Sequence, residues 1–83
     1  MNKQRLLQRI LSGSTQNIAF GGMVALVEAF GFRLSRVTGS HHIFAHAEVR
    51  ELVNLQEVGG RAKPYQIRQF LKLVERYNLK IGD

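Results

Sequence analysis

The sequence predicts a small α+β domain, with a three-stranded antiparallel sheet that helices cover on one face. Two observations support this fold class. Apolar residues recur at helical spacing near both ends of the chain, and between them the period changes to the alternation typical of strands. A chain of 83 residues provides one thin core, so residues 1–83 are expected to form a single domain with any functional site on its surface.

Two helices are expected before the sheet. The first spans residues 2–11, ends near Gly13, and places its apolar residues on one face: Leu6, Leu7, Ile10 and Leu11. The polar segment "SGSTQN" then serves as a linker. The second helix spans about residues 21–30, has a wide apolar face, and ends at Gly31, where helices commonly terminate.

Alternating residues in the middle of the chain predict three strands. In "FRLSRV", Phe32 and Leu34 alternate with polar residues, and "HHIFAH" follows after a short turn at Gly39, so these two strands form a hairpin. The third short strand, "LVNLQ", places Val53 and Leu55 on one face. We expect "AEVRE" to be a polar connection and "EVGGRAK" a flexible basic loop.

The last element is a helix that begins at Pro64, where the missing N–H of proline costs nothing. Its buried face is formed by residues at helical spacing: Ile67, Phe70, Leu71, Val74 and Tyr77. Its other side has a basic stripe formed by residues spaced four apart, Arg68, Lys72 and Arg76. Helices on one face of a three-stranded meander leave the other face to solvent or a partner.

The composition points to a polyanionic partner. Lys and Arg number 12 against 6 Asp and Glu, which gives a net charge of +6 and suits a nucleic acid or an acidic protein.

The absence of cysteine excludes disulfides and thiolate zinc sites. Gln8 and Arg9 interrupt the first apolar run, and no run reaches the ~18 residues of a membrane span, so a cytoplasmic location without a membrane segment is expected. A helix-turn-helix DNA-binding protein is disfavoured because the second helix is nearly all apolar.

All three histidines lie in "VTGSHHIFAH", residues 37–46. On a strand, His42 and His46 point the same way but lie ~13 Å apart, too far for one zinc ion, and His41 points to the opposite face. A metal site formed by these histidines is therefore disfavoured, and no cofactor is expected for this chain. Phe44 is the expected core residue of this strand, so His42 and His46 lean toward the helices, as a support and as a cap at the strand end.

His41 is the best candidate for chemistry on geometric grounds. It follows the turn at Gly39 and Ser40, faces solvent, and can transfer a proton near neutral pH. Four cationic residues are candidates for contacts to a phosphate: Arg33, Arg36, Arg61 and Lys63. A purely structural role for any one of the three histidines also remains open.

The stretch "GFRLSRVTGSHHIFAH" resembles the signature of HicA-type toxins. It contains Gly31-Phe32 at the end of a helix, then Gly39-Ser40-His41, then Ile43-Phe44. The resemblance covers about residues 20–77 and leaves residues 1–13 as an additional amphipathic helix. It implies a fold like the double-stranded RNA-binding domain, α-β-β-β-α. The segment "AEVRELVNLQEVGGRAK" departs from the family because it lacks the usual Pro-rich exit from the third strand.

The resemblance also implies a function. It implies the toxin of a type II toxin–antitoxin system, a metal-independent endoribonuclease that binds and cleaves mRNA and so arrests translation. By position, His41 matches the single catalytic histidine, and Gly39 and Ser40 match the turn that presents it. The implied partner is a HicB-type antitoxin that is acidic where it covers the basic surface. A non-catalytic RNA-binding module with the same basic face is the alternative, and the sequence does not specify an oligomeric state.

Overall fold

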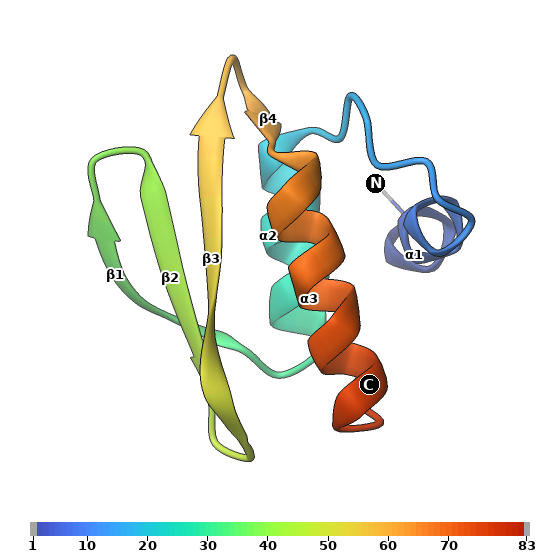
Figure 1. Cartoon of the computed structure of the whole chain (residues 1–83), viewed down its shortest axis with the longest axis vertical. Coiled ribbons are helices and arrows are strands. Elements are labelled where there is room, and N and C mark those ends of the chain that lie inside the picture. The colour runs from blue at the N-terminus through green and yellow to red at the C-terminus, as the bar shows by residue number, and fades with distance from the viewer. Residues whose placement is uncertain (1, 83) are drawn as a thin grey trace.

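Three helices and four strands follow one another in the computed structural model, which describes residues 2–82. The elements are α1 (Lys3–Leu11), α2 (Phe20–Ala29), β1 (Arg33–Thr38), β2 (His41–His46), β3 (Val49–Val58), β4 (Arg61–Ala62) and α3 (Pro64–Arg76). The strands form one antiparallel sheet in the order β1-β2-β3-β4, and α2 and α3 lie on one side of it, with α3 in front of α2 in this view (Figure 1). The expected α+β class and its order of elements are confirmed.

The sheet has one strand more than the three expected. β4, which lies in the segment predicted to be a flexible loop, pairs Arg61 with Val58 and Ala62 with Glu57. The turn between β3 and β4 consists of Gly59 and Gly60, with φ of 59° and 77°. Two successive positive φ angles are typical of a type I′ hairpin turn, which aligns its flanking strands for pairing. The two glycines therefore close a hairpin.

The third strand is also longer than predicted. It begins at Val49, which pairs with His46, so residues 49–51 belong to β3 and not to a connection. The register between β2 and β3 shifts between Phe44 and His46, where β3 carries extra residues. A bulge of this kind disturbs the simple alternation by which strands are recognised in a sequence.

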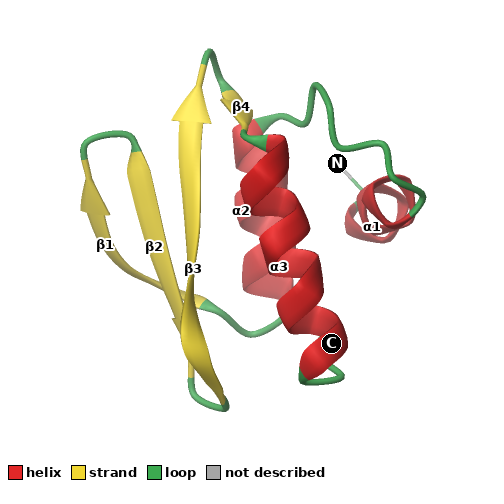
Figure 2. Ribbon diagram, in the orientation of Figure 1, coloured by secondary structure: helices red, strands yellow, loops and turns green. Residues whose placement is uncertain are grey.

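Strand β1 is exposed along its whole length. Phe32, just before it, is fully buried, but Leu34 is 49% exposed, so the expectation that these two residues share a buried face is wrong for Leu34. β1 is the edge strand farthest from the helices (Figure 2), and its register with β2 shifts between Leu34 and Arg36. An edge strand beyond the helix layer has nothing to pack against on that side.

The core lies between the helices and the inner face of β2 and β3. Its aromatic centre is Phe70 of α3, whose ring meets those of Phe30 and Phe32 edge-on at centroid distances of 5.5 and 5.8 Å. α1 packs on α2 and buries Leu6 and Ile10, so the first helix enlarges a thin core. Within residues 2–82, no helix is both long enough and apolar enough to span a membrane.

A polar network fastens the end of α3 to β3. The Tyr77 hydroxyl donates a hydrogen bond to Glu51 Oε1 at 2.6 Å, and Arg76 pairs with Oε2 of the same carboxylate at 2.5 Å. The hydrogen bond from Tyr77 is the largest of the causes that hold the pKa of Glu51 below its usual value. A backbone hydrogen bond and the positive charge of Arg76 lower this pKa further. The bond to Glu51 in turn raises the pKa of Tyr77.

This network predicts a pH-dependent contribution to stability. Because the pKa of Glu51 is lowered on folding, its contribution is present above the unfolded-state pKa of about 4.5 and is lost as the pH falls through the folded-state value. Tyr77→Phe removes the largest cause of the shift. We expect the variant to be less stable at neutral pH and to lose less additional stability on acidification. Urea unfolding at pH 7, 5 and 3 measures this, and parallel pH profiles of the two proteins would contradict it.

Candidate functional site

The turn between β1 and β2 fixes the position of the candidate histidine. Thr38 and His41 pair across the strands, so Gly39 and Ser40 are the two residues of the turn. Gly39 has φ of +59°, a conformation that costs glycine little and that suits the first position of a two-residue hairpin turn. His41 is therefore the first residue of β2, at one end of the sheet.

His41 lies on the face of the sheet that the helices do not cover. Phe44, which is 1% exposed, points into the core, and side chains alternate along a strand. His42 consequently shares the helix side with Phe44, whereas His41 and Ile43 point to the opposite side. His41 is partly exposed there, as expected.

A hydrogen bond orients the His41 ring. Nδ1 lies 3.1 Å from Oδ1 of Asn54, a residue of β3 on the same open face. An amide oxygen can only accept, so this contact requires the tautomer with the proton on Nδ1, which leaves the lone pair of the neutral ring on Nε2. The nitrogen that can take a proton from another molecule is thus the one directed away from Asn54.

A chain of hydrogen bonds also ties the turn to the helix layer. Gln56 Nε2 donates to Ser40 Oγ at 3.2 Å, and the backbone N–H of Glu57 donates to the Ser40 carbonyl at 3.0 Å. The backbone N–H of Gln56 donates in turn to the side-chain oxygen of Gln66, a buried residue of α3. Two hydrogen bonds from β3 therefore hold the residue that precedes His41, which limits the movement of His41 itself.

Asn54 and Gln56 are the residues that the sequence interpretation missed. The signal was present in "LVNLQ", because placing Val53 and Leu55 on the buried face places Asn54 and Gln56 on the open one. What the sequence lacks is the register between β2 and β3. The observed pairs, His41 with Gln56 and Ile43 with Asn54, bring these amides next to His41 and Ser40.

Of the four cationic candidates, the structure brings Arg36 beside His41. Arg36 pairs with Ile43 across β1 and β2, so it is a diagonal neighbour of His41 on the open face. Arg33 pairs with Ala45, four residues farther along β2 and ~13 Å from His41, and donates a hydrogen bond to the Phe32 carbonyl. Arg61 lies in β4, two strands from β2, at the end of the sheet where the β1–β2 turn also lies (Figure 1). Lys63 follows β4 as the N-cap residue of α3.

The two other histidines contact the core. His42 packs edge-on against Phe20 at 4.8 Å. His46 packs against Phe32 at 4.9 Å, and its Nδ1 accepts a hydrogen bond from the backbone N–H of Glu48 at 3.0 Å, so it caps the turn into β3. Gly31 has φ of +97° and leaves room for this ring, because a Cβ there would lie 2.9 Å from His46 Nε2. Both histidines thus have the supporting positions expected of them.

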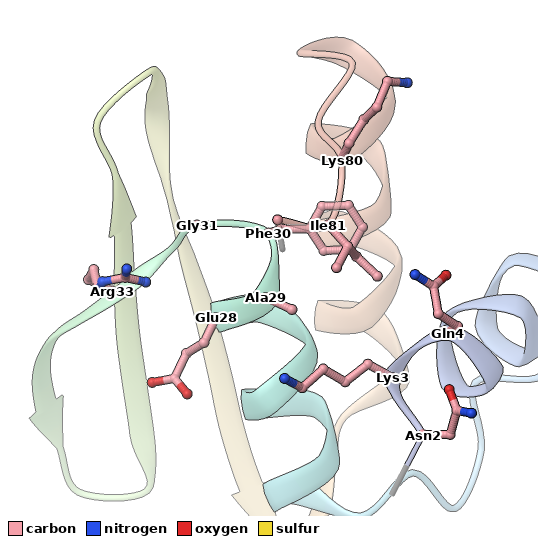
Figure 3. A pocket seen from close by; sticks show the side chains of 11 residues that line it. Asn2, Lys3, Gln4, Glu28, Ala29, Phe30, Gly31, Arg33, Lys80 and Ile81 are labelled. Carbon is pink, nitrogen blue, oxygen red and sulfur yellow. The ribbon is translucent and has the colours of Figure 1, made fainter.

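Two other features of the molecule bear on ligand binding. Among residues 2–82, no three side chains of the metal-binding types come together as a metal site. A cleft of about 540 Å³ opens between the start of α1, the end of α2 and residues 80–82 (Figure 3). Its charged lining residues are Lys3, Glu28, Arg33 and Lys80. His41 does not line this cleft, so the cleft is separate from the histidine site.

Comparison with known proteins identifies the family. A family model described as the HicA toxin of bacterial toxin-antitoxin systems matches residues 23–75, which is more than half of the chain. The chain belongs to the HicA toxin family. The match extends from α2 into α3 and includes His41, Asn54 and Arg36. Comparisons with curated proteins and with solved structures found no match. Family membership makes the chain a toxin of a toxin–antitoxin system, with a cognate antitoxin as its partner.

Proposed function

We propose that this toxin is a metal-independent endoribonuclease that binds and cleaves mRNA with His41 as its single catalytic residue, and so arrests translation. The observation that carries the proposal is the hydrogen bond between His41 Nδ1 and Asn54 Oδ1, which leaves Nε2 as the proton acceptor on an uncovered face. Family membership supports the same conclusion. Gly39 and Ser40 present His41, and residues 20–77 form the RNA-binding core, similar to a double-stranded RNA-binding domain, with residues 1–13 as an addition.

The chemistry needs one positioned base because RNA carries its own nucleophile. Nε2 of His41 removes the proton of a 2′-hydroxyl, and the 2′ oxygen attacks the adjacent phosphorus. The bond from phosphorus to the 5′ oxygen breaks, that oxygen takes a proton from water, and the hydroxide left behind takes up the proton held on His41 Nε2. The products are a 2′,3′-cyclic phosphate and a 5′-hydroxyl end. Arg36, beside His41, offers positive charge to the phosphate as negative charge builds up on its oxygens.

The remaining cationic candidates are placed where they can bind RNA away from the reacting phosphate. Arg33 lies farther along the sheet, and Arg61 and Lys63 lie near the β3–β4 turn. All three are exposed. We propose that they contribute to affinity and not to the chemical step.

The experiment that tests the proposal is cleavage of an end-labelled mRNA fragment by the purified protein in the presence of a chelator. We expect discrete cuts. The alternative function is a non-catalytic RNA-binding module, which the same basic surface and net charge of +6 also suit. That module would retain the fragment in a gel-shift measurement and leave it intact.

The partner and the location follow from the proposed function. We propose that the cognate antitoxin is a HicB-type protein whose acidic surface covers His41 and Arg36, because opposite charges favour that arrangement. mRNA is the substrate, so the toxin acts in the cytoplasm, with no membrane involved. Co-purification of a tagged toxin with the protein encoded by the neighbouring gene tests the partner.

Asn54 is expected to act as a positioning residue. Asn54→Ala removes the acceptor of the Nδ1–H bond, so the His41 ring loses its fixed tautomer and orientation. We expect kcat to fall by about tenfold or more with little change in KM, since hydrogen bonds that orient a catalytic histidine act through its geometry. Nitrogen NMR of the His41 ring supplies a readout independent of activity. An unchanged tautomer in the variant would argue against this role.

A further inference from the structure

We infer that single-stranded RNA runs along the open face of the sheet, from His41 at one end toward Arg50 at the other. By open face we mean the outward side chains of β1, β2 and β3, which include Arg33, Arg36, His41, Ile43, Arg50, Leu52, Asn54 and Gln56. This inference rests on the proposed function and specifies its substrate-binding surface. Neither Arg50 nor Leu52 was among the residues that the sequence suggested for RNA binding.

The strand register defines this face. Val49, Val53 and Leu55 of β3 are buried against the helices, and Glu51 turns to the same side to meet Tyr77. The residues between them, among them Arg50 and Leu52, therefore point outward. Arg50 is exposed, and Leu52 is 55% exposed, a large fraction for a leucine in the middle of a strand. The open face is continuous with the His41 site because Asn54 belongs to both.

The charges of this face have one sign among the residues that the structure describes. Arg33, Arg36 and Arg50 lie on it, whereas the carboxylates lie elsewhere. Glu28 is in α2 and Glu75 in α3, Glu48 is in the β2–β3 turn, Glu51 bonds Tyr77, and Glu57 pairs with the buried Ala62 on the helix side. The charged side chains that a polyanion meets on its approach to His41 across this face are therefore all positive.

The exposed side of α3 is a weaker competitor, although it has the basic stripe seen in the sequence. Arg76 of that stripe is paired with Glu51, and Arg68 is bonded to Thr15 at 3.3 Å. Glu75 adds a negative charge to the same helix. Lys72 remains as an exposed cation there, which makes it a suitable control position.

The apolar residues of the open face indicate which form of RNA it binds. Ile43 and Leu52 lie between Arg36 and Arg50, so a strand whose phosphates contact the arginines would place its bases over two aliphatic side chains. Unpaired bases can make such contacts, whereas the bases of an A-form duplex are stacked inside and present mainly phosphates and 2′-hydroxyls. The combination of separated cations and exposed apolar side chains thus suits a single strand.

The test is equilibrium binding of a fluorescein-labelled 12-mer RNA, single-stranded or annealed to its complement, over a range of salt concentrations. His41→Ala serves as the parent protein, so that the RNA stays intact. We expect Arg50→Gln to weaken binding of the single strand and to reduce the salt slope of log Kd by ~0.7, as for the loss of one phosphate contact. Leu52→Ser should weaken binding of the single strand without changing the slope. Lys72→Gln, which also removes one exposed charge, should leave both quantities unchanged.

Three results would overturn the inference. One is a larger effect of Lys72→Gln than of Arg50→Gln, which would move the RNA to α3. Another is equal or tighter binding of the duplex. The third is unchanged RNA binding by both open-face variants together with weakened binding of the cognate antitoxin, which would make the face a protein-docking surface. Failure of the proposed function is distinguishable, because it would appear as absence of cleavage by the wild-type protein, whatever the binding of these variants.

Discussion

His41→Ala should reduce RNA cleavage by about 10²–10⁴-fold, the usual contribution of a general acid or base, and leave a folded protein. The physical reason is that the variant lacks the group that takes the proton of the 2′-hydroxyl, while Arg36 and the rest of the open face still bind the substrate. KM should therefore change little and kcat should fall. Single-turnover cleavage of a labelled RNA measures the effect, and circular dichroism confirms folding.

His42→Ala is the matched control, since it removes the neighbouring histidine on the other face of the same strand. His42 packs against Phe20 and should affect stability, but cleavage per folded molecule should persist. A folded His41→Ala protein that cuts RNA at the wild-type rate would contradict the assignment. Loss of cleavage in both variants at equal folded fractions would remove the distinction between the two histidines.

Phe70→Ala should destabilise the fold by ~3–5 kcal/mol, the range measured for truncation of buried aromatic residues. Phe70 is 1% exposed, and its ring meets both Phe30 and Phe32 edge-on, so the substitution leaves a cavity where α2, α3 and the start of β1 converge. A domain of this size has only about 5–12 kcal/mol of stability in total, so a large part of it would be lost. Urea unfolding followed by circular dichroism gives the free energy.

Tyr65→Ala is the control for this measurement. It truncates an aromatic residue of the same helix, but Tyr65 is 63% exposed, and its change in stability should stay within about 0.5 kcal/mol. A cost below about 1 kcal/mol for Phe70→Ala would show that the aromatic centre of the core is not where the structure places it.

Local signals in the sequence predicted most of the fold. Pro64 and the helical spacing of Ile67, Phe70 and Val74 defined α3, and the glycine of the β1–β2 turn defined the first hairpin. Phe44 correctly divided the histidine strand into two faces. Each of these features depends on residues that are close in sequence, which is the information that periodicity contains.

Features that depend on strand register could not be predicted in this way. The hydrogen bond between His41 and Asn54 joins residues 13 positions apart, and it exists because β2 pairs with β3 in one particular register. The bulge between Phe44 and His46 hid the start of β3, so Arg50 was assigned to a connection and not to the open face. β4 was missed because a strand of two residues has no period to detect.

The cationic residues illustrate the same limit. Arg33 and Arg36 are only three residues apart in sequence. Because β1 is extended, Arg36 nevertheless lies beside His41, whereas Arg33 lies ~13 Å from it. Proximity to the turn in sequence was therefore a poor guide to proximity in space. The sign of the net charge could be read directly from the composition, but its distribution over the two faces of the sheet required the structure.

The central claim is that His41 activates the 2′-hydroxyl of RNA, and one substrate tests it most directly. Once a cleavage position is mapped in a short single-stranded RNA, the same RNA is synthesised with a single 2′-deoxy nucleotide on the 5′ side of that position. We predict that the wild-type protein binds this RNA but does not cut it there, while it cuts the all-ribose RNA to a 2′,3′-cyclic phosphate end. Cleavage of the deoxy-substituted position at the same rate would show that water is the nucleophile and would contradict the proposed role of His41.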